Sequence, residues 1–166
     1  MNELFGIEDI FDITLPTKEV SLASRLGEIR QQVNVAIYAS NFIPVFCKVT
    51  ATGNRRLAIA TFGKDILLSV AIKKLILPDY ELAVIEDLIA MVKDTRFTES
   101  KYLTGDWHSK FANIVCLGSR FEMMGEDGNL VSQHIFFDNP IEKLTIGLVP
   151  QEVIITPSVG LLLVKK

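Results

Sequence analysis

The sharpest catalytic possibility in this sequence is a pair of side chains, Cys116 and His134. A histidine beside a cysteine can take the thiol proton and create a nucleophilic thiolate. In a hairpin whose two-residue turn is Asp127-Gly128, His134 lies opposite Phe121. The thiol is then about 17 Å further along the same strand and on the other face; a register slipped by one residue puts both on one face but about 20 Å apart. Only a bulge or a different pairing would join them, so the sequence argues against this dyad.

Metal and phosphate sites find no better support. Structural zinc sites need four Cys or His ligands, commonly in close pairs, and no Cys-x-x-Cys, His-x-His or His-Glu-x-x-His occurs. Asp106 and His108 lack a visible third ligand. Gly63-Lys64 lacks the other residues of a phosphate loop, and Gly118-Ser119 lacks the flanking glycines of a nucleophile elbow. The acidic pair Glu126-Asp127 is typical of a solvated hairpin tip. We therefore expect no metal, no cofactor and no enzymatic activity.

One stretch interleaves cations with aromatic rings, between about residues 95 and 111. The residues that we predict to bind a ligand are Arg96, Lys101, Tyr102, Trp107, Lys110 and Phe111. Single-stranded nucleic acid is held by such a combination, because bases stack on rings while cations meet phosphates. Protein interfaces favour the same residue types. A third interpretation is that the rings of Phe97, Trp107 and Phe111 simply pin the loop to the core.

The elements that would position these residues differ between the two halves of the chain. Alternation at 10–15 predicts a strand closed by Pro16, and apolar spacings of three and four predict a helix from about Lys18 into the mid-thirties. Further predictions in this half are a hairpin of 42–50 with 56–62, a helix over 65–77, and a helix over 80–93 capped by Asp79.

The second half reads as strands. They are predicted at 111–124, 130–137, 142–148, 152–156 and 159–164, with a sharp hairpin turn at 126–129. The fold class that we expect is α+β, with N-terminal helices and a hairpin followed by a C-terminal antiparallel sheet or small β-barrel. Residues 1–166 would form a single domain, with a helix-rich half at about 1–94, a loop at 95–109 and a β-rich half at about 110–166.

Composition sets the class of protein. Of the 166 residues, 49% are hydrophobic and 22% charged, so either the core is large or apolar surface is buried against other chains. The net charge of −3 lacks the basic footprint of a duplex-DNA binder. No signal peptide and no apolar run of about 18 residues is visible, which predicts an intracellular location and no membrane span. Cys47 and Cys116 are expected to be free thiols in a reducing compartment.

These observations favour a non-catalytic structural or assembly protein. It would self-associate as a homo-oligomer or join a protein partner in a larger complex, such as a viral particle. The first alternative is a single-stranded nucleic-acid binder whose β-rich half forms a barrel like an oligonucleotide-binding fold. The second is a small enzyme centred on Cys116 or on Asp106 and His108.

Overall fold

Most of the chain that the structure describes is β-strand. The computed structural model describes residues 5–15, 22–30, 34–35, 43–44, 53–94, 111, 113–124, 126–138 and 145–166. The strands are β1 (Phe5–Leu15), β2 (Asn34–Val35), β3 (Ile43–Pro44), β4 (Gly53–Phe62), β5 (Ile66–Leu67), β6 (Tyr80–Leu82), β7 (Asn113–Met124), β8 (Leu130–Asp138), β9 (Thr145–Pro150), β10 (Ile154–Ile155) and β11 (Val159–Lys165). The helices among these residues are α1 (Leu22–Ile29), α2 (Leu68–Lys74) and α3 (Ile85–Lys93).

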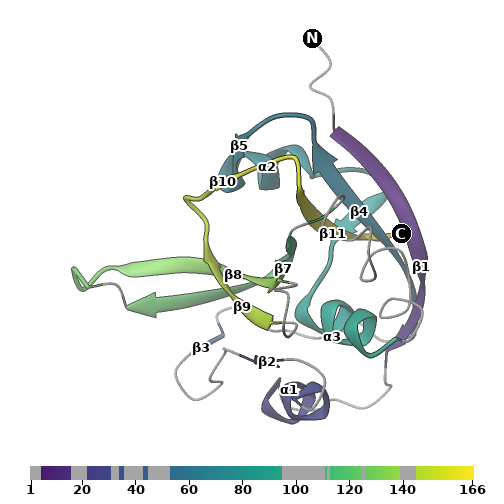
Figure 1. The fold of residues 1–166 in the computed structure, drawn as a ribbon, viewed down its shortest axis with the longest axis horizontal. Helices are drawn as coiled ribbons and strands as arrows, with labels where there is room; N and C mark the ends of the chain where they lie inside the picture. The colour runs from purple at the N-terminus through teal and green to yellow at the C-terminus, as the bar shows by residue number, and fades with distance from the viewer. Residues whose placement is uncertain are drawn as a thin grey trace.

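Nine of these strands form one mixed sheet (Figure 1). Seven follow one another in the order β1-β4-β11-β7-β8-β9-β2, while β3 pairs with β7 and β6 pairs with β11. The pairs β11–β7 and β2–β9 are parallel, and the others are antiparallel. Strands β5 and β10 form a separate two-stranded sheet next to α2.

The centre of the sheet is covered on both faces. Leu57 and Ile59 of β4 belong to an apolar cluster with α1 and α3, while Ala58 and Ala60 belong to a second cluster with α2. The alternate residues of β11 divide between the same two clusters. Strands buried on both faces have continuous apolar runs, which explains the run from Leu161 to Val164.

One edge of β11 is shared between two strands, and this sharing positions the long hairpin formed by β7 and β8. Residues 159–162 of β11 pair with residues 113–116 of β7, whereas residues 163–165 pair with β6. Strand β7 leaves β11 at this point, and its register with β8 is irregular between Cys116 and Arg120. Figure 1 shows the hairpin extending away from the rest of the described chain.

The predicted α+β fold class is wrong. The described helices are three and short, and the strands of the first half are not separate from those of the second. Strand β4 lies beside β11 in the middle of the sheet, although about 100 residues separate them in sequence. The C-terminal sheet is also not purely antiparallel, because β11 runs parallel to β7. Local periodicity gave no information on these long-range pairings.

Several local predictions fail for the same reason. The hairpin of 42–50 with 56–62 does not form, because β4 pairs with β1 and β11 while β3 pairs with β7. The first helix ends at Ile29, well before the mid-thirties. The helix predicted from Tyr80 begins at Ile85, because residues 80–82 pair with β11 as strand β6. The helix predicted over 65–77 is present only as α2.

Candidate functional site

The predicted binding loop falls almost entirely outside the described residues. Arg96, Lys101, Tyr102, Trp107 and Lys110 lie there, as do Asp106 and His108. The remaining member, Phe111, is buried in the apolar cluster that α1 and α3 share with the sheet. A buried ring agrees with the interpretation that this residue pins the loop to the core. Ligand binding by the loop stays a prediction.

The structure places Cys116 and His134 close in the sheet but on opposite faces. The irregularity in β7 pairs Cys116 with Ile135 and Arg120 with His134, so a bulge does shorten the gap between them. Neighbouring residues of a strand point to opposite faces, and His134 therefore lies on the face away from the thiol. The thiol donates to the Ala83 carbonyl at 2.9 Å within the core. The two side chains do not form a dyad.

The bulge is held tightly by the segment that joins β6 to α3. The Gly118 N–H donates to the Ala83 carbonyl oxygen at 2.8 Å. The Oγ atom of Ser119 accepts a hydrogen bond of 2.9 Å from the Ile85 N–H, one of the donors that the start of α3 leaves without a helical partner. A Cβ atom on Gly118 would lie 2.6 Å from the carbonyl oxygens of Leu82 and Ala83. We call residues 116–120, with His134 opposite, the root of the hairpin.

A buried ion pair fixes the start of α3. The Asp87 carboxylate is fully buried and takes two hydrogen bonds from Arg55, at 2.7 and 3.0 Å. It also accepts the Val84 N–H at 2.9 Å, while Arg55 contacts Glu81 at 2.7 Å. Burial raises the pKa of Asp87, and its bonds to Arg55 and Val84 oppose this rise. Burial lowers the pKa of Arg55, but its attraction to Asp87 and Glu81 is stronger and the net shift is upward. Loss of either partner would leave the other as an uncompensated charge beside the start of α3.

His134 is a buried polar group at the root. Neither ring nitrogen makes a well-formed hydrogen bond within the described residues, although backbone groups of Ser119 and Leu117 lie close enough to affect the pKa of the ring. Burial lowers its pKa, and the charge of Arg120 lowers it further, whereas backbone groups of Ser119 and Leu117 act in the opposite direction. The ring is therefore neutral in the folded chain near pH 7, which is consistent with a residue held in an apolar setting.

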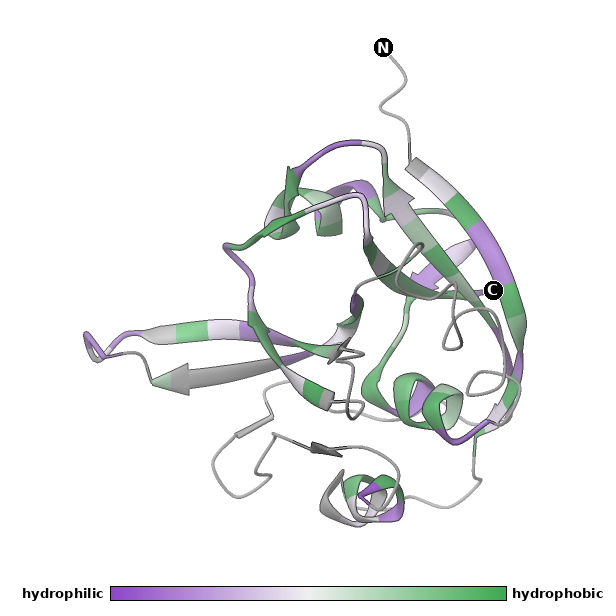
Figure 2. Cartoon of the chain, in the orientation of Figure 1, coloured by the Kyte–Doolittle hydropathy of each residue, from purple (hydrophilic) through white to green (hydrophobic). Residues whose placement is uncertain are grey.

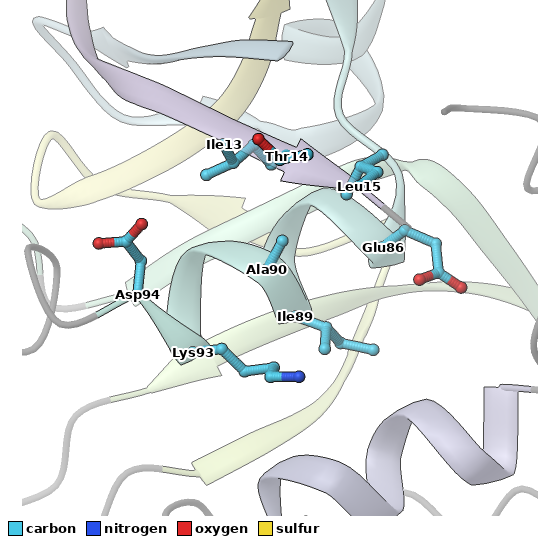
Figure 3. Close-up of a pocket in the computed structure, with 8 residues that line it drawn as sticks. All are labelled: Ile13, Thr14, Leu15, Glu86, Ile89, Ala90, Lys93 and Asp94. Atoms are coloured by element: carbon cyan, nitrogen blue, oxygen red, sulfur yellow. The ribbon is translucent and has the colours of Figure 1, made fainter. Parts of the chain in front are cut away.

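A hollow of about 370 Å³ lies between the end of β1 and α3 (Figure 3). Its polar side chains do not converge on one point: Figure 3 shows Glu86 and Asp94 at opposite ends of the helix. Lys93 forms an ion pair of 2.6 Å with Glu28 of α1. Ligand sites need a few polar groups that point at one ligand, and the described residues that line this hollow do not provide them. Within the described ranges, no group of three or more His, Cys, Asp and Glu side chains is placed to hold a metal ion.

The far end of the hairpin is exposed to solvent, in contrast to the buried root. The predicted turn is confirmed: Gly128 has a φ of 78°, a conformation that suits glycine, and Asp127 accepts hydrogen bonds from the Asn129 backbone at 3.1 Å and side chain at 2.8 Å. These bonds lower the pKa of Asp127. The register differs by one residue from the first one predicted, because His134 pairs with Arg120 and not with Phe121. Figure 2 shows the hydrophilic turn at the end of the hairpin.

Residues 123–131, which we call the arm, have only each other as described strand partners. Strand β3 pairs with β7 at residues 121–122, β9 pairs with β8 from residue 133, and the Ser132 carbonyl accepts the Gln151 N–H. Met124 is 67% exposed and Val131 is 37% exposed. Their positions in the register place them on opposite faces of the two-stranded ribbon. The arm thus presents apolar surface on both faces.

Comparison with known proteins adds no assignment. No family model, curated protein or solved structure matches this chain. None of the described helices combines the length and the apolarity that crossing a bilayer requires. The function has to be inferred from the chemistry of the chain itself, and the arm is a described surface whose exposed apolar side chains the fold of a single chain does not explain.

Sequence reasoning missed the root, although one signal for it was present. A glycine inside a strand pattern often marks a bulge or a close approach of another backbone. Gly118 has this meaning here, because the carbonyl groups of Leu82 and Ala83 leave no room for a side chain. The sequence shows that the approach occurs, but it does not show which segment approaches.

Proposed function

We propose that this chain is a non-catalytic assembly protein that associates through its hairpin arm into a homo-oligomer or a larger protein complex. The single observation that carries the proposal is the exposure of Met124, at 67%, on a ribbon that extends beyond its neighbouring strands. A two-stranded hairpin is only marginally stable in water by itself. A partner that covers the arm would bury its apolar side chains and order it.

The acidic turn supports a protein partner over nucleic acid for this surface. Glu126 and Asp127 are exposed at the tip, and the segment 124–131 contains no Lys or Arg. Phosphate groups would be repelled by these carboxylates, since nucleic-acid binding depends on neutralising phosphates with cations. The arm therefore suits a partner with apolar and basic groups.

The test is the mass of the chain in solution as a function of concentration, measured by light scattering after size exclusion. We expect the wild type to form a species larger than a monomer, and replacement of Met124 and Val131 by serine to shift it to monomer. Ile154→Ser is the matched control, because Ile154 is 64% exposed but lies outside the arm. A wild type that stays monomeric up to about millimolar concentration, a range in which even weak contacts assemble, would overturn self-association.

A second measurement tests whether the arm binds a different protein instead of a second copy of the chain. If the wild type is monomeric but a partner from its source binds it, Met124→Ser should weaken that complex and Ile154→Ser should not. Equal effects of the two substitutions would show that the arm has no special role in the contact.

A further inference from the structure

The surface at the end of α2 has the chemistry that the arm requires. Ile76 follows the helix and is 81% exposed, more than any other large apolar side chain in the described part of the chain. Val70 is also exposed, and Lys73 lies one helical turn after it on the same face. The Ile76 and Val70 side chains contribute little to the core, because the buried residues of this segment are Leu68, Ala71 and Leu75. We call Val70, Lys73, Lys74 and Ile76 the α2 patch.

The α2 patch is positively charged. Lys73 and Lys74 occupy the last turn of the helix. The Nζ atom of Lys166 donates to the Leu77 carbonyl oxygen at 3.4 Å and brings a third ammonium group to this end. Asp79, whose carbonyl oxygen accepts the Lys166 N–H at 3.0 Å, is an acidic residue at the same end, while Asp65 and Glu152 belong to the segments at the start of the helix. Positive charge and exposed apolar surface therefore coincide at the end of α2.

The arm has the complementary set of groups. Met124 supplies an exposed apolar side chain, and Glu126 and Asp127 follow it at the turn. An apolar contact flanked by opposite charges gives both burial and orientation at a protein interface. The face of the arm that carries Met124 matches the α2 patch better than the face that carries Val131, because Val131 is less exposed.

We infer that the arm of one copy binds the α2 patch of a second copy, an inference that rests on the proposed assembly function. The contact joins different copies because Figure 1 shows the arm pointing outward, well separated from α2 of the same chain. Each copy then offers one arm and one patch. Such a contact gives a symmetric dimer if two copies exchange arms, and a closed ring or an open filament if each arm reaches a further copy.

The experiment exchanges the charges across the contact in the full chain. Glu126→Lys reverses the charge at this position of the arm, and Lys73→Glu reverses the charge at this position of the α2 patch. A third variant carries both substitutions. Both residues are exposed, so circular dichroism should show the wild-type fold in all three. Sedimentation velocity over a concentration series should give association about tenfold weaker for each single variant, because like charges then face each other. The doubly substituted chain should recover wild-type association, and so should an equimolar mixture of the two single variants.

The apolar part of the contact has its own control. Ile76→Ser should weaken association, whereas Ile154→Ser, at the other end of α2, should leave it unchanged. A wild type that assembles while Glu126→Lys and Lys73→Glu assemble equally well would overturn this contact and leave the proposed function standing. Weakening by each single variant without recovery in the double variant would also overturn it. A monomeric wild type would overturn the proposed self-association and this contact together.

Discussion

The root and the arm belong to the same hairpin but differ in what holds them. At the root, Ser119 is fully buried, and other segments contact the strand through its backbone and its hydroxyl group. Five residues further along β7, Met124 is largely exposed, and β8 is the one strand among the described residues that pairs with it. Among the described residues, the strand contacts with segments other than β8 therefore end between these two positions. A segment that the fold holds at one end and that is exposed at the other can bind a partner through its exposed end, which the fold itself does not require.

The difference follows from residue types. The root carries the small residues Gly118 and Ser119, which let the segment between β6 and α3 approach the strand closely. The arm carries methionine, valine and two acids, which suit contact with a partner more than close backbone packing. If this comparison is correct, substitutions that affect the root should unfold the chain, and substitutions in the arm should not.

The largest loss of stability is expected when the ion pair between Arg55 and Asp87 at the start of α3 is broken. Arg55→Ala removes both hydrogen bonds that Arg55 donates to the buried Asp87 carboxylate and leaves it the bond from the Val84 N–H. Removing one member of a buried pair costs about 3 to 5 kcal/mol, and the lower end applies because 14% of the Arg55 side chain is exposed. Urea unfolding at pH 7 measures the loss.

The neighbouring arginine is the control for this prediction. Arg56 pairs with Asp12 at 2.8 Å, but both side chains are more than half exposed. Exposed ion pairs contribute little, so Arg56→Ala should change the stability only slightly. Equal losses from the two substitutions would show that the Arg55 pair is not what fixes the start of α3.

A smaller but still large effect is expected inside the root. Gly118→Ala places a Cβ atom 2.6 Å from two carbonyl oxygens, and the backbone of the β6–α3 segment has to move. Overpacking of this kind costs about 2 kcal/mol. Gly27→Ala in α1 is the control: apart from the adjacent residues and the backbone of its own helix, no described atom lies within 4 Å of the added Cβ, and the helix should gain about 0.5 to 1 kcal/mol. A Gly118→Ala chain as stable as the wild type would mean that the bulge is not held by close approach.

The sequence predicted local features better than long-range ones. The turn at 126–129 was predictable because Asp127 and Gly128 specify it by their own chemistry. The pairing of β4 with β11 was not, since it depends on which of several apolar strands meet in space. Tyr80 to Leu82 continues a helical pattern in sequence, and only the free edge of β11 makes it a strand. The arm lay within a predicted hairpin, but its exposure depends on where β3 and β9 end.

Protonation of His134 gives a pH-dependent test of the root. Its pKa is lowered in the folded chain by burial and by Arg120, while the unfolded chain keeps a value of about 6.5. The unfolded state therefore binds more protons below about pH 6.5, so the contribution of the neutral ring is fully present above that pH and is lost as the pH falls towards the folded pKa. We expect the stability to decline over this range, by less than the Gly118→Ala loss.

The control for the histidine is its apolar replacement. His134→Leu should flatten the stability profile between about pH 6.5 and 5, where an unperturbed histidine titrates. His108→Leu measures how much of the slope belongs to the other histidine of the chain. Identical slopes for the wild type and His134→Leu would mean that the ring at the root titrates as freely as it does in the unfolded chain.

The smallest effect on stability is expected in the arm. Met124→Ser removes an exposed side chain from a ribbon without a third described strand, so the free energy of unfolding should change by less than about 0.5 kcal/mol. The measurement is urea unfolding at a concentration at which the wild type is monomeric, because bound partners would add to the apparent stability. Ile135→Ala is the contrast in the same hairpin: Ile135 is fully buried, and its truncation should cost about 2 to 4 kcal/mol. If Met124→Ser costs more than about 1 kcal/mol in the monomer, the chain itself covers the arm, and the exposure on which the proposed assembly rests is lost. If Met124→Ser leaves the stability of the monomer unchanged but weakens association, the arm contributes to partner binding and the root contributes to folding stability.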